Sequence, residues 1–399
     1  MLTEFGSQDQ NTIKYNNTKM VLNIIRTASG ISRSEIARMT GMSPTSATRI
    51  VSDLQEMGLV KETTTSTSGG VGRKAVLLDI NAESFHCAGI DISQKELLIG
   101  IVNFRGTILS THTERIRRDP QDGITMARQI HDMYKKVLAK SYIPESSVKA
   151  VGIGTIGTVD IKSGTVLYAD LLQWSNVPIR RYAEDLFGIP VSVDNEVKCA
   201  LLGEIRAGNI SENDDTVYIT FGRGIGGAIY NNGSLVRGIS NYAGEIGHAI
   251  VDYSDGRLCP CGRRGCSAAY LSEERIISKI KEVAPRISSI DELMSSFQKG
   301  EAWAIPQVER ICDYISIVLS NTICYLNPAN IIMGGSLIDK HPFLFDLSTA
   351  KYNNTCYEPL RISTKFKQSV LKSNSTLAGS ALMAIEDYLN RRLTDLITL

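Results

Sequence analysis

The sequence lacks the features by which secreted and membrane proteins are recognised. No apolar run in its 399 residues approaches the roughly 20 residues that a membrane-spanning helix needs. The N-terminus has no basic segment followed by an apolar one, as a secretory signal would have. The eight cysteines are not spaced as a disulfide framework, which favours a reducing compartment. We therefore expect a cytoplasmic protein with no membrane insertion.

Net charge is also nearly absent. Lys and Arg total 43 and Asp and Glu total 42, which leaves a net charge of +1. This balance argues against a surface that coats nucleic acid or adheres to membranes, although a local basic face is compatible with it. With 43% hydrophobic and 21% charged residues, the composition is that of a globular protein, and the length predicts two or three domains.

What the sequence does contain is a group of candidate metal ligands between residues 244 and 266. One nitrogen and three thiolates are supplied by His248, Cys259, Cys261 and Cys266. This is the ligand set of a tetrahedral Cys₃His zinc site, and four protein ligands leave no position for a reactive water. We interpret the metal as structural Zn²⁺. The alternative, ordinary buried thiols, is less favoured because three cysteines lie within eight residues of a Gly- and Arg-rich loop.

Residues 16–54 have the pattern of a helix-turn-helix. Apolar positions recur at helical spacing at its start. Ser32 and Glu35 form a predicted capping box, Gly41 suits the positive φ of a tight turn, and Ser43-Pro44 begins the next helix. The N-terminus of such a second helix enters the DNA major groove. The candidate DNA-binding residues are Ser43, Pro44, Thr45, Ser46, Thr48 and Arg49.

A hairpin follows the predicted helix-turn-helix. Residues 59–62 and 75–78 have the pattern of strands around a Thr-, Ser- and Gly-rich loop, whose basic tip contains Gly72, Arg73 and Lys74. Such a wing can place an Arg in a narrow minor groove. The alternative is a three-helix bundle that binds no DNA. Residues 1–80 carry nine basic and seven acidic residues, so we expect few phosphate contacts per protomer and a homodimer or tetramer that multiplies them.

From residue 87 the sequence alternates between apolar strands and helices, which predicts an α/β fold. The strand predicted from residue 191 ends in Asn195 and Glu196, and ligands collect at the carboxyl ends of strands in open α/β sheets. A glycine-rich turn at 221–227 suits the close approach of a phosphate, but a tight turn needs glycine as well. An apolar helix predicted over 308–326 belongs either to the core or to a dimer surface.

Two motifs give the chain a resemblance to a known family. Glu245-Ile-Gly-His248 followed by Cys259-Pro-Cys-Gly-Arg-Arg-Gly-Cys266 resembles the signature of the ROK family, which contains bacterial repressors, open reading frames and sugar kinases. The pattern from Ser32 to Pro44 resembles the N-terminal winged helix of ROK repressors, a domain that ROK kinases lack. The resemblance implies an α/β chain with an N-terminal winged helix-turn-helix. A two-lobed actin/hexokinase-like (ribonuclease H-like) domain with a structural zinc site would follow it.

On this basis we expect three units. Residues 1–80 would form the DNA-binding domain, and residues 81–194 would form the N-terminal lobe together with the C-terminal helix 384–399. Residues 195–383 would form the C-terminal lobe with the zinc site and a dimerisation surface. The resemblance implies a sugar-binding cleft between the lobes, formed by Asn195, Glu196, Glu245, His248 and Asp170. Trp174 is expected either in this cleft or in the core.

The same resemblance allows an enzyme to be distinguished from a sensor. The first phosphate loop of ROK kinases reads Asp-Ile-Gly-Gly-Thr, whereas this chain has Asp91-Ile-Ser-Gln-Lys95, whose side chains would obstruct a phosphate. Glu196 stands where the kinases have a catalytic Asp. The extra methylene moves the carboxylate by about 1 Å, which can cost on the order of 10²-fold in rate. Ala268 replaces a Glu that usually grips the sugar. We therefore expect no catalytic residue and no kinase activity.

The predicted function is a DNA-binding repressor of sugar-metabolism genes, controlled by a monosaccharide or a derivative bound between the lobes. Two alternatives remain open at this point. One is an active ATP-dependent sugar kinase that carries a DNA-binding domain. The other is a repressor controlled by a partner protein of a sugar-uptake system.

Overall fold

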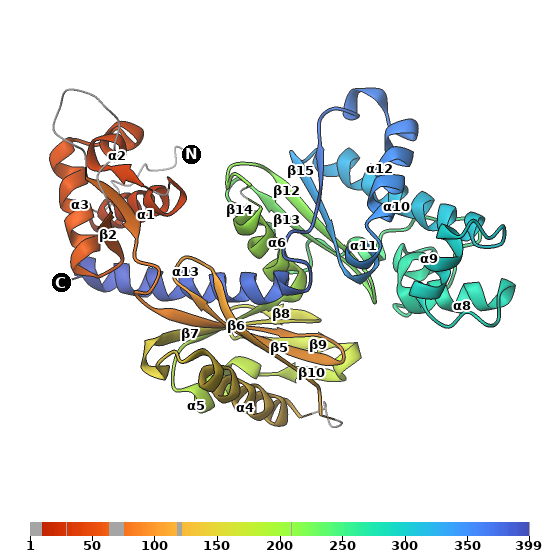
Figure 1. The fold of residues 1–399 in the computed structure, drawn as a ribbon, viewed down its shortest axis with the longest axis horizontal. Coiled ribbons are helices and arrows are strands. Elements are labelled where there is room, and N and C mark those ends of the chain that lie inside the picture. Colours follow the sequence, from red (N-terminus) through yellow and green to blue (C-terminus); the bar gives the residue numbers. More distant parts are fainter. Residues whose placement is uncertain (1–9, 29, 64–75, 118–121, 209, 399) are drawn as a thin grey trace, which may run out of the picture.

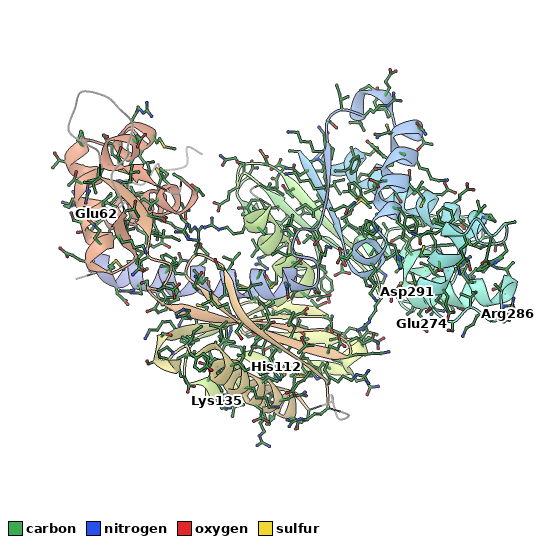
Figure 2. The ribbon with its side chains drawn as sticks, viewed as in Figure 1. Glu62, His112, Lys135, Glu274, Arg286 and Asp291 are labelled. Carbon is green, nitrogen blue, oxygen red and sulfur yellow. The ribbon has the colours of Figure 1, made fainter. Side chains whose placement is uncertain are left out.

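The computed structural model describes residues 10–28, 30–63, 76–117, 122–208 and 210–398. Figure 1 shows an N-terminal helical domain and two α/β lobes, joined by one long C-terminal helix. In Figure 2, Glu62 marks the N-terminal domain, Lys135 the first lobe and Glu274 the second lobe. None of the helices in these ranges is both long enough and apolar enough to cross a membrane.

The N-terminal domain is a winged helix-turn-helix. Its helices are α1 (Gln10–Ala28), α2 (Arg33–Thr40) and α3 (Pro44–Glu56), and its sheet has the order β1 (Ile31–Ser32), β3 (Leu77–Ile80), β2 (Val60–Thr63). The predicted capping box is confirmed, because the Ser32 side chain accepts from the Glu35 N–H and the Glu35 carboxylate accepts from the Ser32 N–H. Gly41 has the predicted positive φ, 69°, and Ser43 caps α3 with Pro44 in its first turn.

The first lobe contains a five-stranded sheet in the order β11-β7-β4-β5-β6. Strands β4 to β6 are antiparallel, and β7 and β11 extend the sheet in parallel. Two helices pack on this sheet, and a small sheet of order β10-β9-β8 follows β7. The bounds are β4 (His86–Ile92), β5 (Glu96–Asn103), β6 (Ile108–Arg115), α4 (Gly123–Ser141), β7 (Val148–Thr155), β8 (Thr158–Asp160), β9 (Thr165–Ala169), β10 (Trp174–Val177), α5 (Ile179–Phe187) and β11 (Val191–Asn195).

The second lobe repeats this plan, with the sheet order β14-β13-β12-β15-β16. Strands β12 to β14 are antiparallel, and β15 and β16 are added in parallel. Two sheets with the same sequence of antiparallel and parallel strands confirm the predicted two-lobed, ribonuclease H-like fold. The strands are β12 (Thr216–Phe221), β13 (Ile225–Asn231), β14 (Ser234–Leu235), β15 (Asn330–Gly334) and β16 (Lys365–Gln368).

The helices of the second lobe include the apolar helix expected over 308–326, observed as α10 (Ile305–Leu326). Its apolar stripe is buried in the core of the lobe, so this stripe is core and not a dimer surface; it comprises Ile311, Ile315, Val318, Leu319 and Ile323. The other helices are α6 (Glu196–Ala207), α7 (Ala268–Leu271), α8 (Glu273–Val283), α9 (Ile290–Gln298), α11 (Ser336–Lys340) and α12 (Phe343–Thr355).

Helix α13 (Ser375–Thr398) joins the winged helix to the two lobes (Figure 1). Its later residues share one apolar core with α1, which includes Ile385, Leu389 and Leu393 on α13 and Val21, Leu22 and Ile25 on α1. Polar contacts add to this core, since the hydroxyl of Tyr15 and the ammonium of Lys19 donate to Asn390 Oδ1 at 2.7 and 3.0 Å. The winged helix is therefore anchored through α13.

The start of α13 lies between the first sheet and α6, and glycine lines both contacts. A Cβ on Gly89 or Gly152 of the sheet would lie 2.2 or 1.8 Å from a carbonyl oxygen of α13. On the other side, a Cβ on Gly379 of α13 would lie 1.6 Å from the Cys199 carbonyl oxygen of α6. The buried Glu204 of α6 accepts hydrogen bonds from the chain that leads into α13; the donors are the hydroxyls of Ser369 and Ser375 and the N–H groups of Val370 and Leu371.

Replacing Gly379 by alanine should destabilise the protein by about 3 kcal/mol, because the new methyl group forces two backbones apart. In an unhindered helix the same substitution stabilises by roughly 1 kcal/mol, so the sign of the effect tests the contact. Urea unfolding gives the measurement. Gly224→Ala is the control, because a Cβ there meets nothing within 4 Å. A Gly379→Ala variant as stable as the wild type would contradict the close approach.

Candidate functional site

The residues expected to bind sugar begin where β11 ends and α6 starts. Asn195 caps α6, with Oδ1 accepting from the N–H groups of Val197 and Lys198 at 2.9 and 3.3 Å. Its Nδ2 donates to the Gly157 carbonyl oxygen at 3.1 Å and to Glu196 Oε2 at 2.9 Å. An amide side chain offers two acceptor positions and two donors. The protein itself therefore uses the whole hydrogen-bonding capacity of Asn195.

Glu196 belongs to a group of three carboxyls. Burial, and after it the charges of Asp91 and Glu245, raise the pKa of Glu196 to about 8. Burial likewise raises the pKa of Asp91 to about 7. Glu245 is exposed and directly precedes a single 3-10 turn, Ile246–His248. The structure thus brings Glu196 and Glu245 near each other, and it adds Asp91 to their group.

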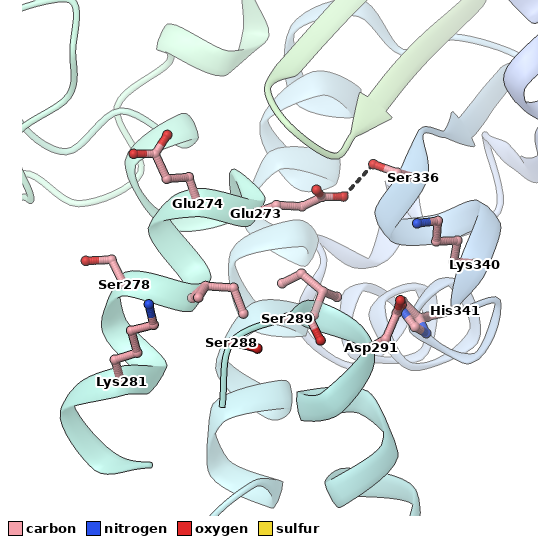
Figure 3. Close-up of a pocket in the computed structure, with 12 residues that line it drawn as sticks. Glu273, Glu274, Ser278, Lys281, Ser288, Ser289, Asp291, Ser336, Lys340 and His341 are labelled. Carbon is pink, nitrogen blue, oxygen red and sulfur yellow. Dashed lines mark hydrogen bonds and ion pairs between the residues drawn. The ribbon is translucent and has the colours of Figure 1, made fainter. Parts of the chain in front are cut away.

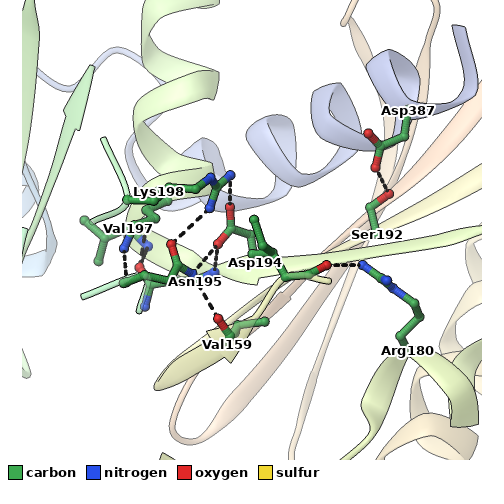
Figure 4. A network of polar contacts seen from close by, with 11 residues as sticks. Val159, Arg180, Ser192, Asp194, Asn195, Val197, Lys198 and Asp387 are labelled. Atoms are coloured by element: carbon green, nitrogen blue, oxygen red, sulfur yellow. Dashed lines mark hydrogen bonds and ion pairs between the residues drawn. The ribbon is translucent and has the colours of Figure 1, made fainter. Parts of the chain in front are cut away.

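A second set of polar groups ties the loop between β14 and Glu245 to the first lobe (Figure 4). Arg237 forms an ion pair of 2.7 Å with the buried Asp194. Asn241 Nδ2 donates to Asp194 Oδ1 at 3.3 Å and to the Val159 carbonyl oxygen at 3.1 Å. The buried ammonium of Lys198 donates to the Asn241 carbonyl oxygen at 2.9 Å. This network fixes the loop that carries Glu245, and the sequence motifs did not identify its members.

The four candidate metal ligands come together in space. Their ligand atoms all lie within 4.8 Å of one another; the residues are His248, Cys259, Cys261 and Cys266. His248 Nδ1 is 3.8 Å from Cys259 Sγ, and Cys261 Sγ is 3.7 Å from Cys266 Sγ. An antiparallel bridge between Ile250 and Cys266 folds the loop back on itself. The cluster could therefore hold a metal ion.

The thiols of this cluster differ in acidity. The backbone N–H of Arg263 lowers the pKa of Cys261 to about 6, whereas burial raises the pKa of Cys266 to about 11. One thiolate is therefore present at neutral pH before any ion binds. A divalent ion would displace the remaining thiol protons, because the thiolate is the form that coordinates metals.

The turn that stands in place of the first phosphate loop is closed by its own side chain. Between β4 and β5, the Ser93 hydroxyl donates to the Glu96 carbonyl oxygen at 2.9 Å and accepts from the Glu96 N–H at 3.3 Å. These bonds hold the Ser93 side chain within the turn. The obstruction of a phosphate by this side chain stays a prediction.

A carboxylate lies beside the second glycine segment. The Glu273 N–H donates to the Gly222 carbonyl oxygen at 2.9 Å, and the Glu273 carboxylate accepts from the Ser336 hydroxyl (Figure 3). Ser336 directly follows Gly334-Gly335, at the start of α11. A negative charge held between these glycine segments repels a phosphate group.

A cavity of about 530 Å³ opens beside this carboxylate, away from Glu196 and Glu245. It is lined by α8, the start of α9 and α11 (Figure 3), and Asp291 forms an ion pair of 3.0 Å with His341 at its edge. Its charged lining consists of three carboxylates, two ammonium groups and one imidazole; these are Glu273, Glu274, Asp291, Lys281, Lys340 and His341. With His341 neutral the lining carries a net negative charge, which does not suit a polyphosphate.

On the winged helix, the first turns of α3 present a polar face to solvent. Thr45, Ser46, Thr48 and Arg49 are exposed, while the opposite face is buried. Ser43 accepts from the Ser46 N–H at 3.1 Å and so fixes the start of the helix. The exposed residues match the expected DNA-binding set. The wing-tip residues Gly72, Arg73 and Lys74 lie outside the described residues.

Trp174 and Asp170 are the two remaining residues considered for the cleft. Trp174 is 1% exposed and belongs to the core of the first lobe. Of its two expected positions, the cleft and the core, the structure shows the core. Asp170 is exposed and accepts from the Tyr168 hydroxyl at 3.3 Å. Within the described part of the chain, no hydrogen bond or ion pair joins Asp170 to Glu196 or Glu245.

Residues 87–387 match the model of the ROK family, and residues 16–61 match that of winged helix-turn-helix DNA-binding domains. Because the first match covers well over half of the sequence, the chain belongs to the ROK family. The xylose repressor of Caldicellulosiruptor bescii is 28% identical over 395 residues, which cover 95% of this chain and 97% of the relative. The N-acetylglucosamine repressor of Escherichia coli O157:H7 is 24% identical over 385 residues, or 93% of each chain.

Solved structures show the same fold. A ROK family transcriptional regulator, described as a homologue of the E. coli MLC protein, superposes with a TM-score of 0.80 at 22% identity and covers 96% of this chain and 98% of its own. The ROK family glucokinase of Streptomyces griseus, solved with glucose and AMPPNP, gives a TM-score of 0.64 at 28% identity. It covers 75% of this chain and 99% of its own length. Similarity to the kinase is therefore confined to part of this chain.

Replacing Glu196 by glutamine should stabilise the protein, and more so at high pH. The pKa of Glu196 rises from 4.5 to about 8 on folding, so the folded protein keeps a proton that the unfolded chain loses above pH 4.5. The free energy of unfolding of the wild type therefore falls between about pH 4.5 and pH 8, and glutamine abolishes this fall. Urea unfolding at about pH 5 and pH 9 measures it, with the exposed Glu145→Gln as the control. If the stability gained by Glu196→Gln does not increase with pH, the raised pKa of Glu196 is contradicted.

Proposed function

We propose that this protein is a transcriptional repressor whose operator affinity is set by a monosaccharide, or a sugar derivative, bound between the lobes. The observation that carries the proposal is a contrast between two halves of one site. The carboxyls on the sugar side are present and accessible, whereas the protein's own groups close or oppose both phosphate segments. The names of the relatives, a xylose repressor and an N-acetylglucosamine repressor, support a regulator that responds to a sugar.

In the proposed sugar site, the Glu196 carboxyl and the Glu245 carboxylate form hydrogen bonds with sugar hydroxyls. A hydrogen bond to a charged carboxylate is the stronger kind. Asn195 is a positioning residue, because its amide is fully used and one of its bonds orients Glu196. His248 presents Nδ1 to the thiols, which leaves Nε2 as the ring nitrogen for a ligand hydroxyl. Ala268 offers no further polar group.

We propose that phosphoryl transfer has been lost. The Ser93 side chain closes the first turn, and Glu273 places a carboxylate beside the second. In the free protein Glu196, with a pKa of about 8, is mostly protonated at pH 7. A protonated carboxyl cannot accept the proton of an attacking hydroxyl. The first two features oppose phosphate binding, and the third opposes deprotonation of the sugar.

The ion that best fits the cluster is Zn²⁺. Tetrahedral coordination at about 2.3 Å for sulfur and about 2.0 Å for nitrogen implies S–S edges of roughly 3.8 Å and S–N edges of roughly 3.6 Å. The corresponding distances in the structure are 3.7 and 3.8 Å. With His248, Cys259, Cys261 and Cys266 as ligands, no position would remain for a water, so the role is structural. The ion would fix the imidazole of His248 and the loop that follows Glu245.

For DNA binding we propose the exposed start of α3 as the helix that enters the major groove of the operator. Thr45, Thr48 and Arg49 are the residues available for base edges and phosphates, while Ser43 and Ser46 cap the helix. The proposed division of the chain is residues 1–80 for DNA binding, 81–194 with residues 384–399 for the first lobe and 195–383 for the second.

The test of the effector is calorimetric titration of the metal-loaded full chain with D-xylose, N-acetyl-D-glucosamine and D-glucose, each with and without ATP. We expect one sugar to bind, ATP to leave its affinity unchanged, and no phosphorylated product to form. Glu245→Gln should weaken that sugar by about tenfold or more, since a hydrogen bond to a charged group is worth roughly 1.5–3 kcal/mol. Glu274→Gln, which alters the cavity of Figure 3, is the matched control.

Each other result has a distinct meaning. Formation of a sugar phosphate would establish the kinase alternative. Weakening by Glu274→Gln and not by Glu245→Gln would place the sugar in the cavity. Failure of every sugar to bind would favour control by a partner protein.

Removing the metal should abolish the response to the sugar before the winged helix unfolds, because the ligands lie in the second lobe, whereas the winged helix shares its core with α13 and the first lobe. We expect a chelator, or Cys261→Ser, to leave operator binding intact while the sugar no longer releases the DNA. Circular dichroism and a DNA-binding assay on the same samples measure both properties. Full release of the operator by sugar from metal-free, folded protein would refute the role assigned to the ion.

A further inference from the structure

Arg26, near the end of α1, contacts carboxylates on two other parts of the molecule, helix α13 and the second lobe. Its side chain is only 7% exposed, and Nη1 lies 2.5 Å from Glu386 Oε1 on α13. On the other side, Nη2 lies 3.6 Å from Glu212 Oε1, in the turn between α6 and β12. Among the hydrogen bonds and ion pairs between described residues, Arg26–Glu212 is the one that joins the winged helix to the second lobe.

The two carboxylates are held by different parts of the structure. Glu386 is on α13, within the stretch that shares its core with α1, so Arg26–Glu386 is internal to one unit. Glu212 follows α6, whose apolar face packs with the second sheet; this cluster includes Val197, Ala200, Leu201 and Ile205 of α6 and Tyr218, Ala228 and Tyr230 of the sheet. The position of Arg26 between them depends on how α6 lies relative to α13.

Helix α6 connects this contact to the proposed sugar site. It begins at Glu196 and ends at Ala207, which at 1.5 Å per residue makes a rod about 18 Å long. The first half of α6 crosses α13, where Gly379 meets the carbonyl group of Cys199, the fourth of the twelve residues of α6. A rigid helix held closely at one point turns about that point, so displacement of one end also moves the other end. A ligand that shifts Glu196 would therefore also shift the turn that carries Glu212.

The charges around Arg26 make the position of Glu212 important. Arg206, at the end of α6, belongs to the same cluster: burial, and then the positive charge of Arg26, lower its pKa to about 10, while Glu212 and Glu386 oppose this. Two carboxylates thus balance two guanidinium groups, and the Arg26 side chain is buried at 7% exposure while that of Glu212 is 46% exposed. When Glu212 moves away, Arg26 and Arg206 are left as neighbours of like charge.

We infer that the ion pair Arg26–Glu212 is the contact through which the winged helix senses the occupancy of the sugar site. The inference rests on the proposed function and names the way in which that site would control DNA binding. In the ligand-free arrangement the pair holds α3 in a fixed place relative to the second lobe. Movement of α6 on effector binding separates Glu212 from Arg26 and frees the winged helix.

The experiment compares Glu212→Gln with the wild type in the full chain, using the strongest duplex selected from random DNA and the sugar panel described above. Because the pair stabilises the ligand-free arrangement, its loss should weaken operator binding without sugar by about threefold or more. It should tighten sugar binding without DNA by up to the same factor, and shrink the effect of sugar on operator affinity. Opposite changes in the two affinities are the distinguishing result, since general damage to the fold would weaken both.

Glu145→Gln is the matched control. Glu145 pairs with Lys135 at 2.6 Å on the first lobe, away from the winged helix (Figure 2), and its side chain is 52% exposed against 46% for Glu212. It should change neither affinity. Unchanged affinities in Glu212→Gln, or a loss of both, would overturn the inference and leave the proposed function standing. If the wild type binds no sugar, the proposed effector is wrong, and operator affinity alone tests the inference. An operator affinity of Glu212→Gln equal to that of the wild type would still overturn the inference.

Discussion

The architecture depends on the close approach of α13 to the elements on either side of it. Glycine at positions 89 and 152 of the first sheet, and at 379 of α13 itself, lets backbones meet where any side chain would separate them. Contacts of this kind keep helices from sliding along one another. Because the later part of α13 completes the core of the winged helix, the same close packing that joins the lobes also sets the place of the DNA-binding helix.

Within the proposed site, some charged residues are paired with other residues and hold the structure, whereas others are proposed to bind the ligand. Asp194 is compensated by Arg237 and Asn241 and serves to hold a loop. Among the described residues, no ion pair compensates Glu196 or Glu245, and burial, followed by the charges of Asp91 and Glu245, raises the pKa of Glu196. Carboxyls that are left uncompensated in this way favour a ligand that donates hydrogen bonds, which a sugar hydroxyl does. On the proposed function, a phosphate would meet the Ser93 side chain and the Glu273 carboxylate, so the two halves of the site would select opposite kinds of ligand.

Much of the fold could be predicted from the sequence, because its signals are local. The capping box of Ser32 and Glu35, the strand-and-helix alternation and the spacing of His248 and the cysteines each involve residues close together in the chain. The contacts that were missed are between distant residues. Lys198 would be expected in water by its chemistry, and its burial depends on a partner 43 residues away, Asn241. Arg26 is paired with Glu386 across 360 residues, and no local pattern indicates such a pair. Asn195 was expected to bind the sugar. That its amide has no free hydrogen-bonding position could be judged only from its four partners in the structure.

The order in which the chain is synthesised gives the α1–α13 core a further consequence. Tyr15 and Asn390, which meet across this core, are 375 residues apart, an interval that takes roughly 20–75 s to translate at about 5–20 residues per second. Throughout that time Val21, Leu22 and Ile25 lack the α13 side of their core. A nascent chain therefore cannot present a completed DNA-binding domain. The core of the winged helix is completed only with α13, after both lobes have been made. On the proposed function, every molecule able to bind an operator would already carry the lobes that bind the sugar.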